Sequence, residues 1–283
     1  MRTDLAKESR TRFQDLPGIR EERKELYGLE ALTITVETEE AAKRLDKPMG
    51  IYSTLTFPQE LLKNGDVLAL SRAAAALLNI LLPKEGHILV IGLGNRYITA
   101  DSLGTKTAEN MMVTRHLLEG FSDLLPRGIR EVSSFCAGVL GVTGLETVEV
   151  VSALCEKIHP KAVLVVDSLA ASDPVHLGSV LQMNDSGISP GAGIGNFQTS
   201  LNRQTLDVPV IAIGIPLVVD TMAVIRSVCP GNVPETVENG IRDLCMTPKD
   251  IDLIARNGAR LLTESIHRAL YGKNCSALKK LLQ

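Results

Sequence analysis

The chain has 283 residues, of which 45% are hydrophobic and 22% are charged, and Lys plus Arg (30) nearly balance Asp plus Glu (33). This composition excludes intrinsic disorder, because so apolar a chain can bury enough surface to offset its ordering entropy. A net charge of -3 and an aromatic content of 3% argue against direct nucleic-acid binding, which needs a basic field or stacking rings.

Cysteines and histidines show no disulfide or metal-binding spacing. The five cysteines are scattered without a C-x-x-C pair, and the five histidines form no H-E-x-x-H motif. We therefore expect no metal, no cofactor and a reduced compartment. The chain begins with charged residues, and every apolar run is interrupted before the roughly 18 residues of a membrane span. We expect a cytoplasmic protein without a membrane partner.

The first 84 residues predict two strands and a helix. Ala31–Glu37 alternates as a half-buried strand does, and Gly50–Phe57 is a second strand that ends before Pro58. Leu70–Leu82 is rich in strong helix formers. We interpret residues 5–84 as an N-terminal elaboration.

From residue 85 onward, buried strands alternate with helices. The predicted strands are His87–Ile91, Ala162–Val166 and Val208–Gly214, the last leading into Ile215–Asp220. The predicted helices are Thr105–Leu118, a helix through Ile158 opened by a T-x-x-E capping box at Thr143 and Glu146, and Thr247–Leu270 with Thr247 as N-cap and Pro248 after it. This alternation predicts a three-layer α/β fold with a mainly parallel sheet and helices on both faces. We expect residues 1–283 to form a single domain, with residues 85–283 as core and C-terminal helices.

Three aspartates follow the predicted core strands. Only seven of the sixty residues from 161 to 220 are charged, so a carboxylate there needs an explanation. Asp101 lies in the loop after the first core strand, Asp167 follows the second, and Asp220 ends the third. Ligands of open α/β sheets gather beyond the carboxyl ends of the strands. We therefore expect Asp101 and Asp167 to converge as a catalytic pair, one activating water and the other, protonated, acting on the carbonyl or the leaving amine.

Each aspartate also has a structural interpretation. An Asp at a strand end often caps the next helix, which applies to Asp167 and more strongly to Asp220, before Thr221–Val228. The same carboxylates could instead hold a divalent metal ion. Spacing alone leaves these alternatives open.

Two glycine-rich segments do not complete a nucleotide-binding motif. Gly92-Leu93-Gly94-Asn95 follows a strand, but Tyr97 occupies the third glycine position of G-x-G-x-x-G. The segment Asp185–Asn196 lacks the Lys-Ser/Thr ending of a phosphate loop. Its glycines could let backbone amides approach a ligand, or it could be a plain loop.

Short motifs in a fixed order resemble the spore germination proteases. The resemblance covers residues 85–225, with weaker matches at Arg2–Ala6 and Met246–Lys249. The matching segments are Val90–Asn95, Thr99–Gly104, Glu109–Leu117, Gly144–Thr147, Val165–Ala171, Gly187–Ile188 with Pro190–Gly191, and Val210–Pro216 with Val218–Asp220. Each motif alone is weak, but together the match is specific.

This resemblance implies an endopeptidase of the spore core that degrades small acid-soluble spore proteins during germination, with a fold related to the hydrogenase-maturation endopeptidases. It places the family's proposed catalytic aspartates at Asp101 and Asp167. It also implies a homotetrameric zymogen that cleaves its own N-terminal segment between an acidic residue and an apolar residue followed by Ala. By this match, cleavage falls between Asp4 and Leu5, so that residues 1–4 are a short propeptide or the chain starts close to its mature end.

Three positions depart from the family pattern. Ser189 replaces a His before the Pro-Gly of the glycine-rich loop, Ser172 replaces an Arg after the second aspartate, and Arg96 stands where an aromatic residue is usual. Both aspartates are kept, so we expect the chemistry to persist, while Ser189 and Ser172 bear on substrate contacts or full activity.

Two other functions are open at this point. A metal-dependent endopeptidase of the hydrogenase-maturation kind would be sensitive to a chelator. A non-enzymatic α/β module that binds a small ligand in its strand-end loops would show no proteolysis.

Overall fold

The computed structural model describes residues 3–13, 16–191, 199–228, 231, 233–241 and 244–282. Its strands are β1 (Ile19–Leu26), β2 (Leu29–Val36), β3 (Gly50–Thr56), β4 (Ile88–Gly92), β5 (Val132–Cys136), β6 (Ala162–Ala171), β7 (Val180–Asn184), β8 (Val210–Asp220) and β9 (Cys245–Met246). Its α-helices are α1 (Ala6–Thr11), α2 (Glu39–Leu45), α3 (Gln59–Lys63), α4 (Leu68–Leu81), α5 (Leu103–Glu109), α6 (Arg115–Gly120), α7 (Leu140–Thr143), α8 (Thr147–Ile158), α9 (Arg203–Leu206), α10 (Thr221–Val228), α11 (Glu235–Ile241), α12 (Ile251–Tyr271) and α13 (Cys275–Leu282). Short 3-10 helices are η1 (Thr99–Asp101), η2 (Ser122–Leu124), η3 (Pro174–His176) and η5 (Gly272–Asn274).

The strands form one sheet with a parallel half and an antiparallel half. β5, β4, β6 and β8 lie side by side in that order and run parallel. Beyond β8 the sheet continues through β7, β3, β2 and β1, each antiparallel to its neighbour, and β9 pairs with the end of β8. The α/β class is thus confirmed, and the N-terminal elaboration supplies most of the antiparallel strands.

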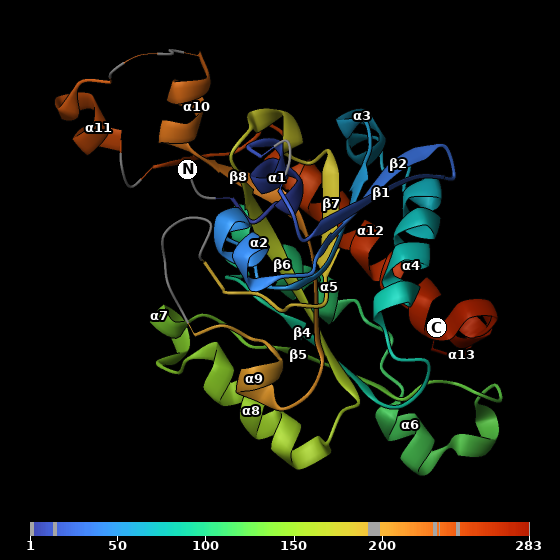
Figure 1. Ribbon diagram of the computed structural model, residues 1–283. Coiled ribbons are helices and arrows are strands. Elements are labelled where there is room, and N and C mark those ends of the chain that lie inside the picture. Colours follow the sequence, from blue (N-terminus) through green and yellow to red (C-terminus); the bar gives the residue numbers. More distant parts are fainter. Residues whose placement is uncertain are drawn as a thin grey trace.

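Side chains of the central strands alternate between two helical layers. In β4, Ile88 and Val90 pack into a core cluster with α4 and α12, whereas Leu89 and Ile91 pack into a second cluster with α8. Successive residues of a strand point to opposite faces, so a run without polar residues serves a sheet that is covered on both sides. Figure 1 shows α4, α5 and α12 over one face and α8 and α9 over the other.

The edge of the antiparallel half is a charged hairpin. β1 and β2 are joined by Tyr27 and Gly28, both with positive φ, as a tight two-residue hairpin turn requires. Between its ends β1 exposes a run of Arg, Glu and Lys side chains. Charges of this kind protect an edge strand from pairing with another chain.

Among the residues described, five strands lie where the sequence predicts strands, namely β2, β3, β4, β6 and β8, whereas β1, β5, β7 and β9 are not predicted. The predicted segments Val208–Gly214 and Ile215–Asp220 form one strand, β8. The strand β6 is predicted to end at Val166 but continues to Ala171. Residues 168–171 continue to pair with β8, because β8 itself extends to Asp220. Asp167 therefore lies inside a strand and not after one.

The prediction of one helix over Thr105–Leu118 is wrong. α5 ends at Glu109 and α6 begins at Arg115. Between them, the Met112 N–H donates to His267 Nε2 at 2.9 Å, and the Tyr271 hydroxyl donates to the Met112 carbonyl. Side chains of α12 thus take the main-chain groups that a continuous helix would have paired internally.

Two predicted helix starts are also displaced. Thr143 ends α7, and α8 begins after Glu146, whose N–H donates to Glu149 Oε2 at 2.9 Å, so the box is formed by the two glutamates. α12 begins at Ile251 and not at Thr247, because residues 248–251 form a turn in which Ile251 N–H donates to the Pro248 carbonyl. Within the described ranges, none of the helices combines the length and apolar character needed to cross a membrane.

Candidate functional site

Asp101 is held by the tight turn after β4. Gly94 has a φ of +92°, and a Cβ there would lie 2.0 Å from the Asp101 carbonyl oxygen, so the close approach requires glycine. The Asn95 N–H donates to Asp101 Oδ2 at 2.7 Å. The segment Gly92–Asn95, which resembles part of a nucleotide-binding motif in the sequence, therefore positions the Asp101 carboxylate.

Asp167 lies where the sheet loses one of its central strands. β4 pairs with β6 only as far as Gly92 opposite Val166, and the chain then turns away through Leu93, whose N–H still donates to the Val166 carbonyl. Asp167 is the next residue of β6. Its side chain is buried, and its Oδ1 accepts the Ser168 N–H at 2.8 Å.

The charge of Asp101 acts on the buried carboxyl group of Asp167. Burial raises the pKa of Asp167 well above its usual range, and the negative charge of Asp101 raises it further. Burial also raises the pKa of Asp101, against the hydrogen bond from Asn95. The structure therefore brings Asp101 and Asp167 together, and it does so in a setting where the pair retains a proton more readily than free carboxylates do.

A third carboxylate reaches the same place from the N-terminus. The Asp4 N–H donates to the Ala170 carbonyl at 2.9 Å, and the Ala170 N–H donates to Asp4 Oδ2 at 2.7 Å. The charge of Asp4 adds to the rise in the pKa of Asp167. The adjacent Leu5 is fully buried in an apolar cluster with side chains of β6, β7, β8 and α10. The segment from residue 3 to residue 6 thus lies along β6 as a bound peptide would.

Glu8 anchors this segment at the end of β6. Its Oε2 accepts the N–H and the hydroxyl of Ser172, each at 2.7 Å, and its Oε1 accepts the Asp173 N–H at 3.0 Å and faces His176 Nδ1 at 2.6 Å. Burial alone would raise the pKa of Glu8, but hydrogen bonds led by that of His176 lower it to about 2. Ser172, which departs from the family's Arg, therefore remains a partner of the N-terminal segment.

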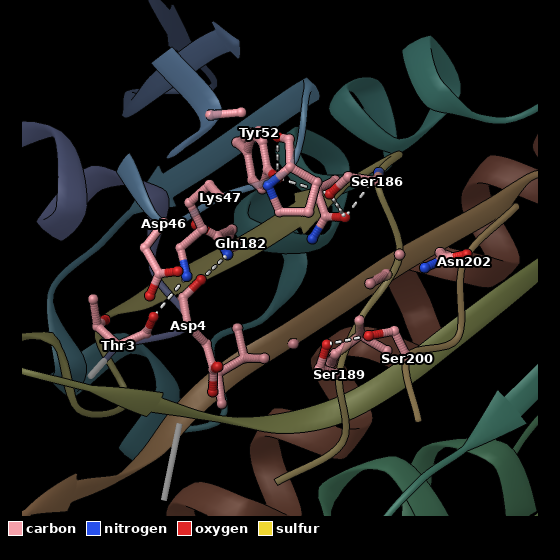
Figure 2. Close-up of a pocket in the computed structure, with 18 of the residues that line it drawn as sticks. Thr3, Asp4, Asp46, Lys47, Tyr52, Gln182, Ser186, Ser189, Ser200 and Asn202 are labelled. Carbon is pink, nitrogen blue, oxygen red and sulfur yellow. Dashed lines mark hydrogen bonds between the residues drawn. The ribbon is translucent and has the colours of Figure 1, made fainter. Parts of the chain in front are cut away.

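A groove of about 740 Å³ opens beside Thr3 and Asp4. Figure 2 shows Asp4 and Thr3 on one side of it and Ser189, Ser200 and Asn202 on the other. Its floor includes Leu169 and Gly214, which flank the position of Asp167 in the sheet. The groove therefore reaches the strand position opposite Asp167, although neither Asp101 nor Asp167 is among the residues that line it.

The remaining candidates from the sequence are Asp220, the glycine-rich segment 185–196 and Ser189. Asp220 Oδ1 accepts the Ala223 N–H at 3.0 Å, so Asp220 caps α10, as its alternative interpretation predicts. The glycine-rich segment Asp185–Asn196 is described only to Gly191, and residues 192–196 lie outside the described residues. Ser189, which replaces the family's His, shares a hydrogen bond of 2.6 Å with Ser200. In the part of the chain that the structure describes, no three His, Cys, Asp or Glu side chains cluster closely enough to hold a metal ion.

Sequence reasoning missed Lys47, Glu8 and Gln182. Gln182 had a detectable signal, because it is a buried polar residue inside the strand Val180–Asn184. Lys47 and Glu8 look like ordinary surface charges in the sequence. Their role depends on contacts with residues more than forty positions away.

A sheet with helices on both faces and two neighbouring carboxyl groups beyond the end of a central strand is typical of enzymes that use acid–base chemistry. The model of the germination protease family matches residues 1–229. The germination protease of Caldanaerobacter subterraneus is 35% identical over 95% of this chain and 94% of its own length, and that of Clostridium perfringens is 33% identical over 95% of both. The germination protease of Bacillus subtilis is 34% identical over 79% of this chain and 64% of its own length. The chain therefore belongs to the germination protease family and is a protease.

Among solved structures, a nickel–iron hydrogenase maturation protease from Thermococcus kodakarensis is similar over 67% of this chain and 98% of its own, with 16% identity and a TM-score of 0.38.

Proposed function

We propose that this protease is an endopeptidase that begins the degradation of small acid-soluble spore proteins during germination, with Asp101 and Asp167 as its catalytic pair. The observation that supports this most is the placement of the two carboxyl groups at the end of β4, where burial and the charge of Asp101 both raise the pKa of Asp167. The spore core, the homotetramer and the zymogen state that the resemblance implies are part of the same proposal.

The chemistry follows from the different surroundings of the two groups. Asp167 is buried more deeply and has the more strongly raised pKa, so it holds the shared proton. Asp101 then takes a proton from the attacking water, while Asp167 donates its proton to the carbonyl oxygen of the peptide. As the tetrahedral intermediate collapses, the proton on Asp101 passes to the leaving amine, and a hydroxyl group of the intermediate returns a proton to Asp167. Each proton is accounted for, and the pair returns to its starting state.

The N-terminal segment fits a self-processing step at Asp4–Leu5. Asp4 lies against β6 beside Asp167, and Leu5 is fully buried. A segment held in this way has its main chain fixed along β6, at Ala170, three residues from Asp167, before the reaction begins. Loss of residues 1–4 would remove the charge of Asp4 from the neighbourhood of Asp167.

The experiment that tests the function uses the purified full chain and a small acid-soluble spore protein. The two are incubated with and without a chelator, and the fragments are identified by mass. The proposal predicts cleavage after an acidic residue in both samples. Cleavage only without the chelator would favour the metal-dependent alternative, and no cleavage under either condition, by the full chain or by a chain without residues 1–4, would favour the binding module.

A further inference from the structure

Two side chains hold the main chain around the Asp4–Leu5 bond. Gln182 Nε2 donates to the Asp4 carbonyl oxygen at 2.8 Å, and Gln182 Oε1 accepts the Ala6 N–H at 2.6 Å. Lys47 Nζ donates to the Thr3 carbonyl oxygen at 2.7 Å. Figure 2 shows Lys47 and Gln182 side by side, with their hydrogen bonds to Thr3 and Asp4.

Within the described residues, the side-chain hydrogen bonds of Gln182 join main-chain groups that every peptide has. Its amide offers one donor and one acceptor, and these meet a C=O and an N–H that flank residue 5. The side chain is 3% exposed within β7, so its position is fixed by the sheet. A buried amide in this arrangement fixes the register of a peptide without selecting its sequence.

Lys47 also contacts the main chain, at the Thr3 carbonyl oxygen, but its positive charge acts in addition on the Asp4 side chain, a position that varies between peptides. Burial raises the pKa of Asp4, and both the Ala170 N–H and the positive charge of Lys47 oppose this rise. Lys47 is itself half-buried and comes from the turn after α2, with its stem against the groove. A partly desolvated cation beside the residue before the bond favours an acidic side chain over a neutral one of the same shape.

We propose that Lys47 and Gln182 form the substrate-recognition surface of this protease, and that residues 3–6 occupy it here as a substrate does. Lys47 selects the acidic residue before the cleaved bond, and Gln182 holds the main chain across that bond. The inference rests on the proposed function. The open groove beside Thr3 and Asp4 leaves room for the rest of a longer peptide.

The test compares two peptides that differ only by Asp or Asn before the cleaved bond. The full chain is used, and kcat/KM is measured for each peptide. The chain's own segment competes equally with both peptides, so the ratio of the two kcat/KM values does not depend on the cost of displacing it. We expect wild type to prefer the Asp peptide, and Lys47→Met to reduce that preference on the order of tenfold, which corresponds to one lost charge contact.

Gln182→Ala has a different expected signature. Both peptides lose the same main-chain contacts, so kcat/KM falls for each while the ratio keeps its wild-type value. Lys47→Glu completes the set with a third peptide that carries Lys at the same position, which this variant is expected to cleave better than the Asp peptide. Lys24→Met removes an exposed positive charge of β1 and is the matched control. Thermal unfolding checks each variant, and Lys47→Gln replaces Lys47→Met if that variant does not fold.

The outcomes separate the two claims. If wild type cleaves neither the peptides nor a spore protein, the proposed function fails. If wild type cleaves but Lys47→Met keeps the wild-type ratio of kcat/KM, Lys47 holds only the Thr3 carbonyl and the recognition surface is wrongly assigned. An unchanged kcat/KM in Gln182→Ala would overturn the proposal that Gln182 holds the main chain of the substrate.

Discussion

Asp167 and Gly214 lie opposite each other in the parallel pairing of β6 with β8. A Cβ at Gly214 would stand 2.4 Å from the Asp167 carbonyl oxygen and 2.7 Å from Leu169 Cγ. Because Gly214 has no side chain, the main chain of β6 at Asp167 can pack closely against β8.

Gly214→Ala is expected to damage both stability and activity. The added methyl group has to displace β6, which costs about 1–3 kcal/mol for overpacking of this kind, and it moves Asp167 relative to Asp101. Thermal unfolding and kcat for a spore-protein peptide measure the two effects. Gly240→Ala is the control, because a Cβ there meets no atom within 4 Å and Ala favours the helix α11. Equal behaviour of the two variants would contradict this account of Gly214.

Asp167→Asn is expected to be more stable than wild type at neutral pH. The folded-state pKa of Asp167 is raised, so its contribution to stability is present below the unfolded value and is lost as pH rises through the folded value. Asn cannot ionise, and replacing a strained functional group commonly gains about 1 kcal/mol, or roughly 2–4 °C in Tm. Unfolding curves at pH 8 and pH 4 should show a gain at pH 8 that shrinks at pH 4. A gain that does not change with pH would contradict the role of ionisation.

The N-terminal anchor should weaken in acid. The pKa of Glu8 is lowered from 4.5 to about 2, so its stabilising contribution is present above 4.5 and is lost as pH falls toward 2. Wild type should exceed Glu8→Gln by about 3 kcal/mol in the free energy of unfolding at pH 7, with the difference closing over that acidic range. Denaturant unfolding at pH 7, 5, 4 and 3 measures it, and Glu25→Gln on the exposed strand β1 is the control. A difference independent of pH would argue against the Glu8 hydrogen-bond network.

The central sheet and the neighbouring aspartates follow from the sequence for a simple reason. Residues 88–91 are all apolar because both faces of the strand are covered, and the carboxyl ends of adjacent parallel strands lie at one edge. Asp167 directly follows the apolar residues 162–166 but lies inside β6, and Asp101 lies in η1, in the connection after β4. Local patterns are sufficient here because the carboxyl ends of parallel strands lie at the same edge of a sheet whatever the rest of the chain does.

Other features depend on partners far away in the chain. β6 extends past Asp167 because β8 is long enough to pair with it, and the break after α5 exists because His267 and Tyr271 take the main-chain groups of Met112. The return of the N-terminus depends on Ala170 and Gln182, more than 160 residues away. No local propensity encodes such contacts, so sequence patterns alone do not reveal them.

The most direct test of the catalytic pair compares Asp101→Asn, Asp167→Asn and Asp220→Asn on one spore-protein peptide. Asp220 ends the adjacent strand β8, six residues beyond Gly214, and caps α10, a task that Asn performs equally well, so this variant controls for the general effect of an Asp to Asn change. Initial rates are measured on variants whose circular dichroism matches wild type. The account predicts a loss of about 10²–10⁴-fold in kcat for Asp101→Asn and for Asp167→Asn, with the rate of Asp220→Asn unchanged. Full activity in a folded Asp101→Asn or Asp167→Asn variant would contradict it.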